Sequence, residues 1–309
     1  MSETEENSFR NVVLPFIIFT TIWGGTWIVI RGQIGTVPPQ WSVAYRFLIS
    51  ATAMWIIAAA RGERLAMKRR HWPALAFLGF SQFCVNFNAV YLAEQRITSG
   101  VVATVFALLL IPSSLLGWAM LGQRPNLRFL WGSLVAVAGI GLLFAHELHA
   151  GAASPMQVVA GIGITLIGML GASAANVFQA RPKMRQLPLF SMLAWAMTLG
   201  ALFDCLVALA LAGPPEIDWS LGYLAGLFYL ALAASVLSFS LYYPVIRRIG
   251  PARAAYSSMA VPIIAMGFST WFEDYRWTVT TISGAALALG GMALALSRNR
   301  SKVAVADAA

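Results

Sequence analysis

The chain has 309 residues, of which 59% are hydrophobic and 11% are charged. Soluble domains carry about 25% charged residues, so this composition excludes an ordinary soluble protein and indicates a polytopic membrane protein. The net charge of +9 does not point to nucleic acid, because almost all of the basic residues lie between apolar runs. We therefore expect the lipid bilayer, and no nucleic acid, as a partner.

Ten apolar runs are each long enough to cross a bilayer, which requires about 20 residues per helix. They cover roughly 12–30, 41–60, 72–93, 99–120, 127–145, 157–178, 188–212, 219–243, 252–272 and 277–297. The segment before them, MSETEENSFR, is acidic, which is unlike the basic start of a cleaved signal peptide. We expect residues 1–11 to be a cytoplasmic N-terminus and residues 298–309 a cytoplasmic tail.

The basic residues alternate between the two sides that ten spans define. Seventeen lie on one side and three on the other, which predicts that both chain ends are cytoplasmic. The three are Arg31, Arg96 and Arg276. The seventeen are Arg10, Arg61, Arg64, Lys68, Arg69, Arg70, Arg124, Arg128, Arg181, Lys183, Arg185, Arg247, Arg248, Arg253, Arg298, Arg300 and Lys302.

A glycine and proline pattern recurs 150 positions along the chain, which predicts a repeat. Gly100, Pro112 and Gly117 return as Gly250, Pro262 and Gly267. A repeat of five spans, here 12–145 and 157–297, places its second copy upside down in the membrane. Proline lacks an N–H and bends its helix, so paired prolines favour a cavity between the halves and a bending role in transport. The alternative is that both prolines are packing kinks.

The chain resembles the EamA branch of the drug/metabolite transporter superfamily. The residues that carry this resemblance are WGGTWIVI, PPQWSVAYRF, and the proline-containing spans followed by GQRPN and FEDYRW. The resemblance covers residues 12–297 and extends to the bacterial aromatic amino acid exporters. It implies an all-α membrane protein of ten helices, arranged as two inverted five-helix repeats around a central cavity. Glu273 fits the family pattern, whereas Gln123 stands where the first repeat usually has a glutamate.

Residue types needed for several other chemistries lie outside the spans or stand alone. Lysine occurs only at Lys68, Lys183 and Lys302, which lie in loops or the tail, so a retinal Schiff base is excluded. The three histidines, His71, His146 and His149, have no metal-ligand spacing and offer no triad base. Cys84 and Cys205 each lie alone inside an apolar run. We therefore expect no enzyme, metal or cofactor.

Two charged residues lie within spans, Arg46 and Asp204. A charge at the bilayer centre costs about 2.5–3.5 kcal/mol on insertion scales, so each requires a partner or water. The two occupy equivalent spans, and one hypothesis is that they form an ion pair. The other is that Asp204 couples transport to protons; with a single titratable site, the protein could also be an uncoupled facilitator.

Three amides lie in the third span, within GFSQFCVNFNAVYLAEQ. Gln82 and Asn86 share one helical face, whereas Asn88 lies about 200° around from Asn86. We expect Gln82 and Asn86 to line the substrate path, and Asn88 with Tyr91 to hydrogen-bond a neighbouring helix. The opposite assignment stays open. Amides both donate and accept, so they suit the two ends of a neutral amino acid.

Further lining candidates lie in other spans. Trp23 and Tyr256 are aromatic candidates, although aromatic membrane residues also serve as packing or interfacial anchors. Polar candidates are Asn176 in the sixth span and Ser238, Ser240 and Tyr242 in the eighth. Gly163, Gly168 and Gly171 instead favour close helix packing.

Together these observations predict an exporter of neutral amino acids, aromatic ones included, in the inner membrane of a bacterium. Alternating access between the halves is the expected mechanism, and the direction of transport is implied by the resemblance alone. The alternatives are a carrier of nucleotide sugars or sugar phosphates, which would require basic residues in the cavity, and a membrane enzyme or sensor. The oligomeric state is not predicted.

Overall fold

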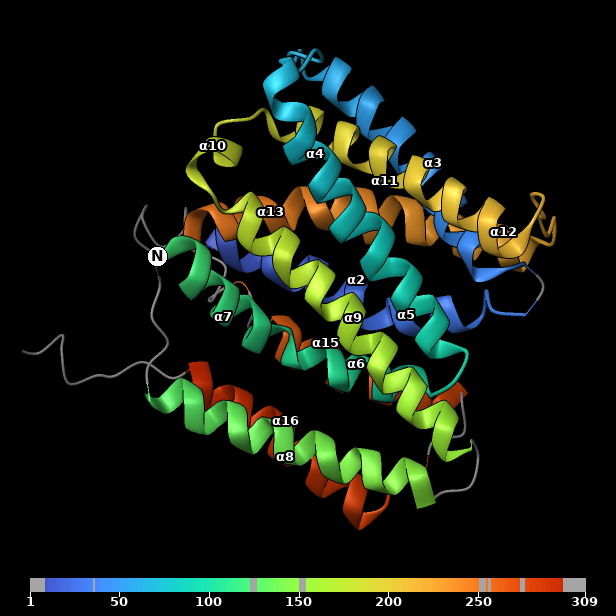
Figure 1. Cartoon of the computed structure of the whole chain (residues 1–309), viewed down its shortest axis with the longest axis vertical. Helices are drawn as coiled ribbons and strands as arrows, with labels where there is room; N and C mark the ends of the chain where they lie inside the picture. Colours follow the sequence, from blue (N-terminus) through green and yellow to red (C-terminus); the bar gives the residue numbers. More distant parts are fainter. Residues whose placement is uncertain are drawn as a thin grey trace, which may run out of the picture.

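The computed structural model describes residues 9–35, 37–122, 127–149, 154–249, 254, 257–272 and 276–296. These residues form helices, joined by loops that include one isolated bridge between Ile34 and Val37. Figure 1 shows that the helix axes are roughly aligned, so that the helices form a bundle. In the first half they are η1 (Phe9–Val13), α2 (Leu14–Arg31), α3 (Pro39–Ala60), η2 (Arg69–His71), α4 (Trp72–Leu78), η3 (Gly79–Val85), α5 (Asn86–Glu94), α6 (Ser99–Phe106), η4 (Ala107–Leu109), α7 (Leu110–Leu121) and α8 (Leu127–His149).

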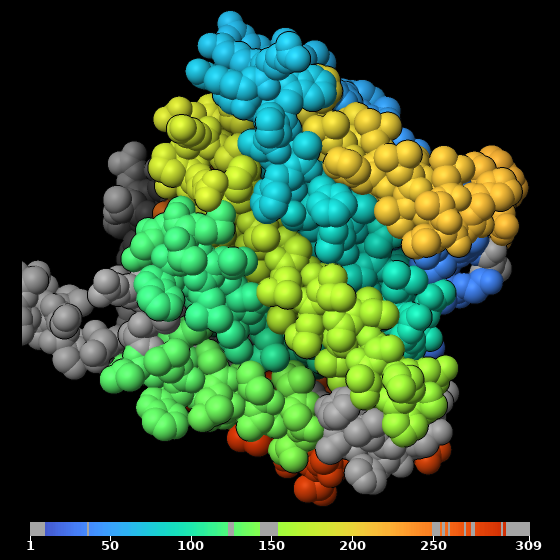
Figure 2. All heavy atoms as spheres, viewed as in Figure 1, coloured from blue at the N-terminus to red at the C-terminus, as the bar shows by residue number. Residues whose placement is uncertain are grey.

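The second half continues the bundle. Its helices are α9 (Pro155–Gln179), α10 (Pro182–Arg185), α11 (Leu189–Ala212), α12 (Leu221–Phe228), η5 (Tyr229–Leu237), α13 (Ser238–Ile249), α15 (Ser257–Phe272) and α16 (Val279–Leu296). On the face shown in Figure 2, α9 and the α4–α5 segment meet along their side chains without a visible opening. Any cavity between them is therefore covered from this side.

Within the described residues, seven helices are long and apolar enough to cross a membrane. They are Arg10–Arg31, Pro39–Ala60, Arg69–Glu94, Ser99–Leu121, Pro155–Gln179, Leu189–Ala212 and Leu221–Arg248. Three shorter apolar helices, Leu127–Leu142, Ala260–Phe272 and Val279–Gly291, fall on the other predicted runs. Trp131, Leu134, Leu206 and Leu209 are each more than half exposed, as expected for side chains that face lipid.

Proline and glycine set several helix ends. Prolines occupy the first turn of α3 and α9, where an N–H would have no partner within the helix. Ser154 and Gln157 also cap α9 through two reciprocal hydrogen bonds. Gly122 ends α7 with a φ of 71°, and Gly213 ends α11 with a φ of 81°, values that favour glycine.

Besides η1, which is also π-helical, two spans contain the π-helical segments η3 and η5, whose first residues Gly79 and Tyr229 lie 150 positions apart. A π-helix widens the turn and leaves backbone groups less regularly paired. In η5, the Ser235 hydroxyl donates to the carbonyl of Leu230, and the carbonyl of Ala234 accepts from Trp23 Nε1 on α2. Side chains thus supply part of the hydrogen bonding around the widened turn.

The helices α3 and α11 pack against each other in opposite directions. Trp41 Nε1 near the start of α3 donates to the carbonyl of Gly213 after α11, across 3.2 Å. Towards the other end, Trp55 Nε1 donates to Thr198 Oγ1 across 3.0 Å. Residue numbers rise along one helix as they fall along the other, so the second and seventh predicted spans are antiparallel neighbours.

The helices α8 and α16 form a second antiparallel pair at the lower edge of Figure 1. A Cβ added at Gly139 would lie 2.4 Å from the Ala288 nitrogen, and one added at Gly291 would lie 2.4 Å from the Ala136 nitrogen. The two contacts are equivalent, since Ala136 and Gly139 correspond to Ala288 and Gly291 with the same offset of 152. Glycine is required on both sides for the backbones to approach this closely.

Segments that carry predicted cytoplasmic charges contact each other at one end of the bundle. Arg248 donates to the carbonyl of Asn11, and Arg185 donates to the carbonyl of Arg247. At the same end, Glu63 accepts from the backbone and hydroxyl of Ser191. Asn11, the end of α13 and the segments after α3 and α9 therefore lie together.

Candidate substrate cavity

A cavity of about 120 Å³ lies inside the bundle, walled by side chains from both halves of the chain. Its lining is Trp23, Thr26, Trp27, Ile30, Arg46, Gln82, Asn86, Phe87, Val90, Ala103, Phe106, Ala107, Leu109, Ala172, Asn176, Phe239, Tyr242, Ser257, Ser258 and Val261. These residues come from α2, α3, η3, α5, α6, η4, α9, α13 and α15. The antiparallel α8–α16 pair does not contribute to this wall.

Aromatic rings form one side of the cavity. The Trp23 ring lies 4.8 Å from that of Tyr242 and 5.6 Å from that of Phe239, and Trp23 Nε1 is fixed by the carbonyl of Ala234. Trp27 packs on Phe106 with 5.7 Å between ring centroids. Such edge-on and tilted contacts hold the rings in place and leave apolar faces for a ligand.

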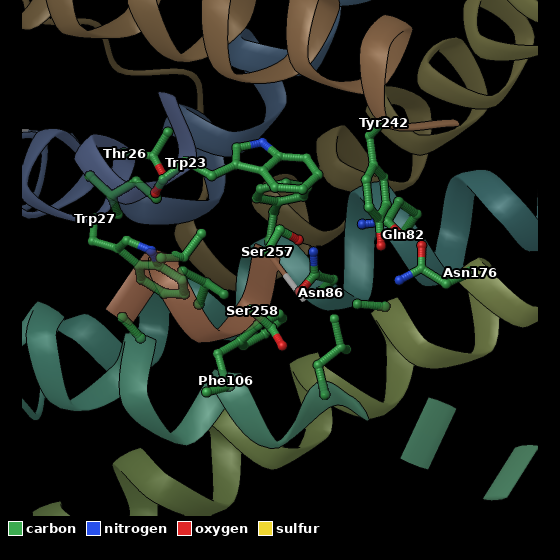
Figure 3. A pocket seen from close by; sticks show the side chains of 18 of the residues that line it. Trp23, Thr26, Trp27, Gln82, Asn86, Phe106, Asn176, Tyr242, Ser257 and Ser258 are labelled. Carbon is green, nitrogen blue, oxygen red and sulfur yellow. The ribbon is translucent and has the colours of Figure 1, made fainter. Parts of the chain in front are cut away.

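Three amide side chains form a polar part of the wall, which Figure 3 shows beside Tyr242 and Ser257. Gln82 lies on η3, Asn86 begins α5 and Asn176 lies near the end of α9. All three are buried, and their amide oxygens have no hydrogen-bond partner within the described residues. Buried polar atoms are normally paired, so an unpaired set at one cavity indicates a place for a ligand or water.

Small residues bring the three amides into one wall. A Cβ added at Gly171 of α9 would lie 2.8 Å from the Ser81 carbonyl oxygen of η3. One added at Gly168 would lie 2.9 Å from the Ala89 Cβ of α5. This confirms the predicted close packing at both glycines, whereas Gly163 faces open space. Close approach of α9 to η3 and α5 is what places Asn176 beside Gln82 and Asn86.

Arg46 also reaches the cavity, from α3, and its side chain is 1% exposed. Its Nε donates to Ser235 Oγ on η5 across 3.0 Å, and its guanidinium carbon lies 4.3 Å from the centre of the Phe87 ring. Nη1 has no hydrogen-bond partner within the described residues. The cavity wall therefore contains one basic side chain held on two sides.

A comparison of the chain with family models is decisive at this point. The model of the EamA-like transporter family matches residues 11–145 and again residues 159–297. The chain belongs to the EamA-like transporter family. Two matches in one chain also place a family domain on each half of the cavity wall.

Curated relatives of this EamA-like protein are named as transporters. YoaV of Bacillus subtilis, an uncharacterized transporter, is 21% identical over 91% of this chain and 95% of its own length. YedA of Escherichia coli K12, an uncharacterized inner membrane transporter, is 28% identical over 81% and 78%. A probable amino-acid metabolite efflux pump of Salmonella typhimurium is 23% identical over 89% and 91%.

One solved crystal structure has a fold similar to that of the EamA-like chain. It aligns with a TM-score of 0.69 at 17% sequence identity, and the alignment covers 91% of this chain and 95% of that one. At this identity the likeness bears on the fold and leaves the substrate open.

The predicted lining residues of this EamA-like chain fall into three groups. Gln82, Asn86, Asn176 and Trp23 lie in the cavity wall. The Ser240 hydroxyl instead donates to the carbonyl of Val236 in its own helix, and Ser240 is outside the lining. Tyr256 lies outside the described residues. That these six residues bind the substrate stays a prediction.

Asn88 and Tyr91 face away from the cavity wall that Gln82 and Asn86 form. Asn88 Nδ2 donates to Asp204 Oδ1 on α11 across 2.7 Å, and the Tyr91 hydroxyl donates to Gln33 Oε1 across 3.4 Å. The first bond confirms that Asn88 hydrogen-bonds a neighbouring helix, whereas the partner of Tyr91, Gln33, lies in the turn after α2.

The hypothesis of an ion pair between Arg46 and Asp204 stays a prediction. Within the described residues Asp204 accepts from Asn88, while Arg46 donates to Ser235, and no ion pair joins the two. Each of the two has other partners: the guanidinium of Arg46 lies over Phe87 of α5, and Asp204 accepts from the neighbouring Asn88. Asp204 is also absent from the cavity wall.

The predicted bending residues lie next to the cavity. Pro112 is buried in α7, just after the 3₁₀ turn η4 that interrupts the span, and Ser173 on α9 donates to the nearby carbonyl of Leu109. Pro262 lies inside α15 and has no N–H for the carbonyl of Ser258, a lining residue. Gly117 is buried and Gly267 faces open space.

Sequence reasoning missed several lining residues. Ser257, Ser258 and Phe239 were not singled out, and Arg46 was assigned to a pair and not to the wall. A signal for the serines was available, because they stand four and five positions before Pro262, where a cavity-facing break was expected. No comparable signal marks Phe239.

Proposed function

We propose that this EamA-like protein exports neutral amino acids, aromatic ones included, across a bacterial inner membrane. The observation that carries the proposal is the cavity, which combines an aromatic side with three buried amides whose oxygens have no partner among the described residues. Aromatic rings can pack against the apolar side chain of an amino acid. Amides, which carry no charge themselves, can hydrogen-bond its polar backbone end. The similarity to an amino-acid metabolite efflux pump agrees with this substrate class.

The proposed mechanism is alternating access between two inverted five-helix repeats that together make ten membrane helices. Two packing relationships support it: α3 against α11 and α8 against α16 are antiparallel pairs of corresponding helices. The π-helical segments 150 positions apart give further support. Inverted repeats that share one central site are typical of carriers that rock one half against the other.

We place both chain ends in the cytoplasm. The count of 17 basic residues on one side against three on the other supports this orientation. The contacts of Arg248 with Asn11 and of Arg185 with Arg247 support it as well, because they gather those loops at one end.

The experiment is flux of labelled compounds into proteoliposomes that contain the purified protein. The panel includes phenylalanine, leucine, glutamate and lysine, each with and without a pH gradient. We expect phenylalanine or leucine to equilibrate faster than in protein-free liposomes. If no amino acid in the panel moves faster than in the protein-free vesicles, the proposal is wrong. A rate that responds to the gradient indicates proton coupling, and an unchanged rate indicates a facilitator.

A second candidate substrate is a sugar phosphate, because Arg46 lies in the cavity wall and arginine binds phosphate well. The same vesicles discriminate the two classes when labelled glucose 6-phosphate is added to the panel. Flux of the phosphate without flux of amino acids would favour the second candidate.

A further inference from the structure

We propose that Arg46 binds the carboxylate of the substrate and that the amides of Gln82, Asn86 and Asn176 receive its ammonium group. The inference rests on the proposed function and sharpens it, since it restricts the substrate to free amino acids with both ends unblocked. Amides, esters and N-acylated derivatives of the same amino acids are then poor substrates.

Arg46 is built into the wall as a binding group. Ser235 Oγ accepts from its Nε, and Phe87 lies under the guanidinium plane, so the side chain has little freedom. A guanidinium has five N–H donors, and those on Nη1 are without a partner in the described residues. A carboxylate matches such donors in shape and charge.

Among the residues that the structure describes, no carboxylate forms a direct ion pair with Arg46. Asp204, the other charged residue inside the predicted spans, accepts from Asn88 with its Oδ1. A buried charge is unfavourable unless an opposite charge or hydrogen bonds compensate it. A bound carboxylate would compensate Arg46, and this makes an anionic end of the ligand favourable here.

The unpaired atoms on the amides have the opposite character. On Gln82, Asn86 and Asn176 they are oxygens, which accept hydrogen bonds and do not donate them. An ammonium group has three donors and no acceptor, so it is complementary to three such oxygens. Figure 3 shows the Gln82, Asn86 and Asn176 side chains turned towards the same region of the cavity.

A zwitterion fits this arrangement better than a phosphate. One guanidinium balances one carboxylate, whereas a dianionic phosphate would keep an unbalanced charge among acceptor oxygens. The aromatic side, with Trp23, Trp27 and Phe106, remains for the amino acid side chain.

The first test uses the unaltered protein and three ligands of nearly equal size. L-phenylalanine carries both charged ends, L-phenylalaninamide lacks the carboxylate, and N-acetyl-L-phenylalanine lacks the ammonium. Binding is followed by the fluorescence of the cavity tryptophans or by calorimetry. We expect each derivative to bind on the order of 10- to 100-fold more weakly than phenylalanine, as for the loss of one charged hydrogen-bonding group. Equal affinity for phenylalanine and either derivative overturns the inference.

The second test replaces Arg46. In R46Q we expect phenylalanine to bind as weakly as phenylalaninamide does. The affinity of R46Q for phenylalaninamide should stay within about threefold of the affinity of the unaltered protein for the same ligand. Thr52→Ala, on the exposed side of the same helix, is the matched control and is expected to leave the difference between the two ligands unchanged. A folded R46Q that still prefers phenylalanine over its amide contradicts the inference.

These outcomes separate the inference from the proposed function. Absence of amino acid flux in the proteoliposome panel overturns the proposed function and, with it, this inference. Flux of phenylalanine together with equal flux of its amide overturns the inference alone. If R46Q does not fold, the ligand series on the unaltered protein still tests the inference.

Discussion

Asn88 Nδ2 and Asp204 Oδ1 lie 2.7 Å apart, so α5 is bonded to α11 on the side that faces away from the cavity. Asp204 is fully buried, and its other carboxylate oxygen has no partner within the described residues. The bond therefore holds the helix that carries Asn86 while keeping a buried carboxyl group out of the substrate's path.

Replacing Asn88 with alanine is expected to destabilise the protein without changing its substrate preference. Loss of the donor leaves a buried carboxylate oxygen unpaired, which costs about 1–3 kcal/mol. The measurement is thermal unfolding in detergent for N88A, D204A and the double variant. Since the two side chains contact each other, the double variant should lose less stability than the sum of the singles. Additive losses would show that the bond contributes nothing.

Alanine at Gly139 or Gly291 is expected to weaken the α8–α16 pair. The added Cβ would lie 2.4 Å from a backbone nitrogen of the partner helix, and forced overpacking costs about 1–3 kcal/mol. Gly141→Ala and Gly290→Ala are matched controls on the same helices, because nothing lies within 4 Å of either position. The controls should be neutral or stabilising, since alanine favours helix by about 1 kcal/mol over glycine. Equal melting temperatures for both sets would contradict the close pairing.

Phenylalanine at Trp23 is expected to cost more stability than phenylalanine at Trp27. Both substitutions keep an aromatic ring in the cavity wall, but Trp23 Nε1 donates to the carbonyl of Ala234 in η5, whereas Trp27 Nε1 is without a partner in the described residues. The difference between the two variants should be about 1 kcal/mol, the net contribution of one hydrogen bond. Thermal unfolding of the two purified variants measures it. A Trp27 variant that is the less stable one would argue against a role for this bond in holding η5.

Alanine at Gln82 and at Asn86 is expected to slow flux without loss of folded protein. Each change removes a polar group from the cavity wall, and we expect apparent affinity for the amino acid to fall on the order of 10-fold. Thr52→Ala is the control, because Thr52 is exposed on the outside of α3 and donates to its own helix at Leu48. Labelled flux at several substrate concentrations separates affinity from rate. Unchanged flux in both Gln82 and Asn86 variants would show that substrate does not use this wall.

The helices were predictable from the sequence because lipid imposes a length on apolar runs. The expected span 41–60 is the helix Pro39–Ala60, and 157–178 is the helix Pro155–Gln179. The position of Asn88 on a different face from Asn86 was also predictable, since both lie on the regular helix α5 and a separation of two residues turns the chain by about 200°.

The site was less predictable, because a membrane helix is apolar on both its lipid face and its cavity face. Periodicity alone therefore could not tell that Arg46 reaches the cavity wall and that Asp204 bonds to Asn88. The π-helical segment η3 adds to the difficulty, since it changes the rotation of Gln82 relative to the residues that follow. Ser240 shows the same limit: a serine in a span often donates to its own helix, as this one does to Val236.

Substrate protection of a cavity cysteine tests the central claim, that transported amino acids occupy this cavity. Ser258→Cys is made in a chain whose two cysteines, Cys84 and Cys205, are replaced by alanine. Thr52→Cys in the same chain is the control on the lipid-facing side. The measurement is the rate of labelling by a small thiol reagent in proteoliposomes, at rising concentrations of phenylalanine. We predict that phenylalanine slows labelling at position 258, over the range that saturates flux, and leaves position 52 unaffected. Labelling at 258 that is unchanged at concentrations that saturate flux would contradict the account.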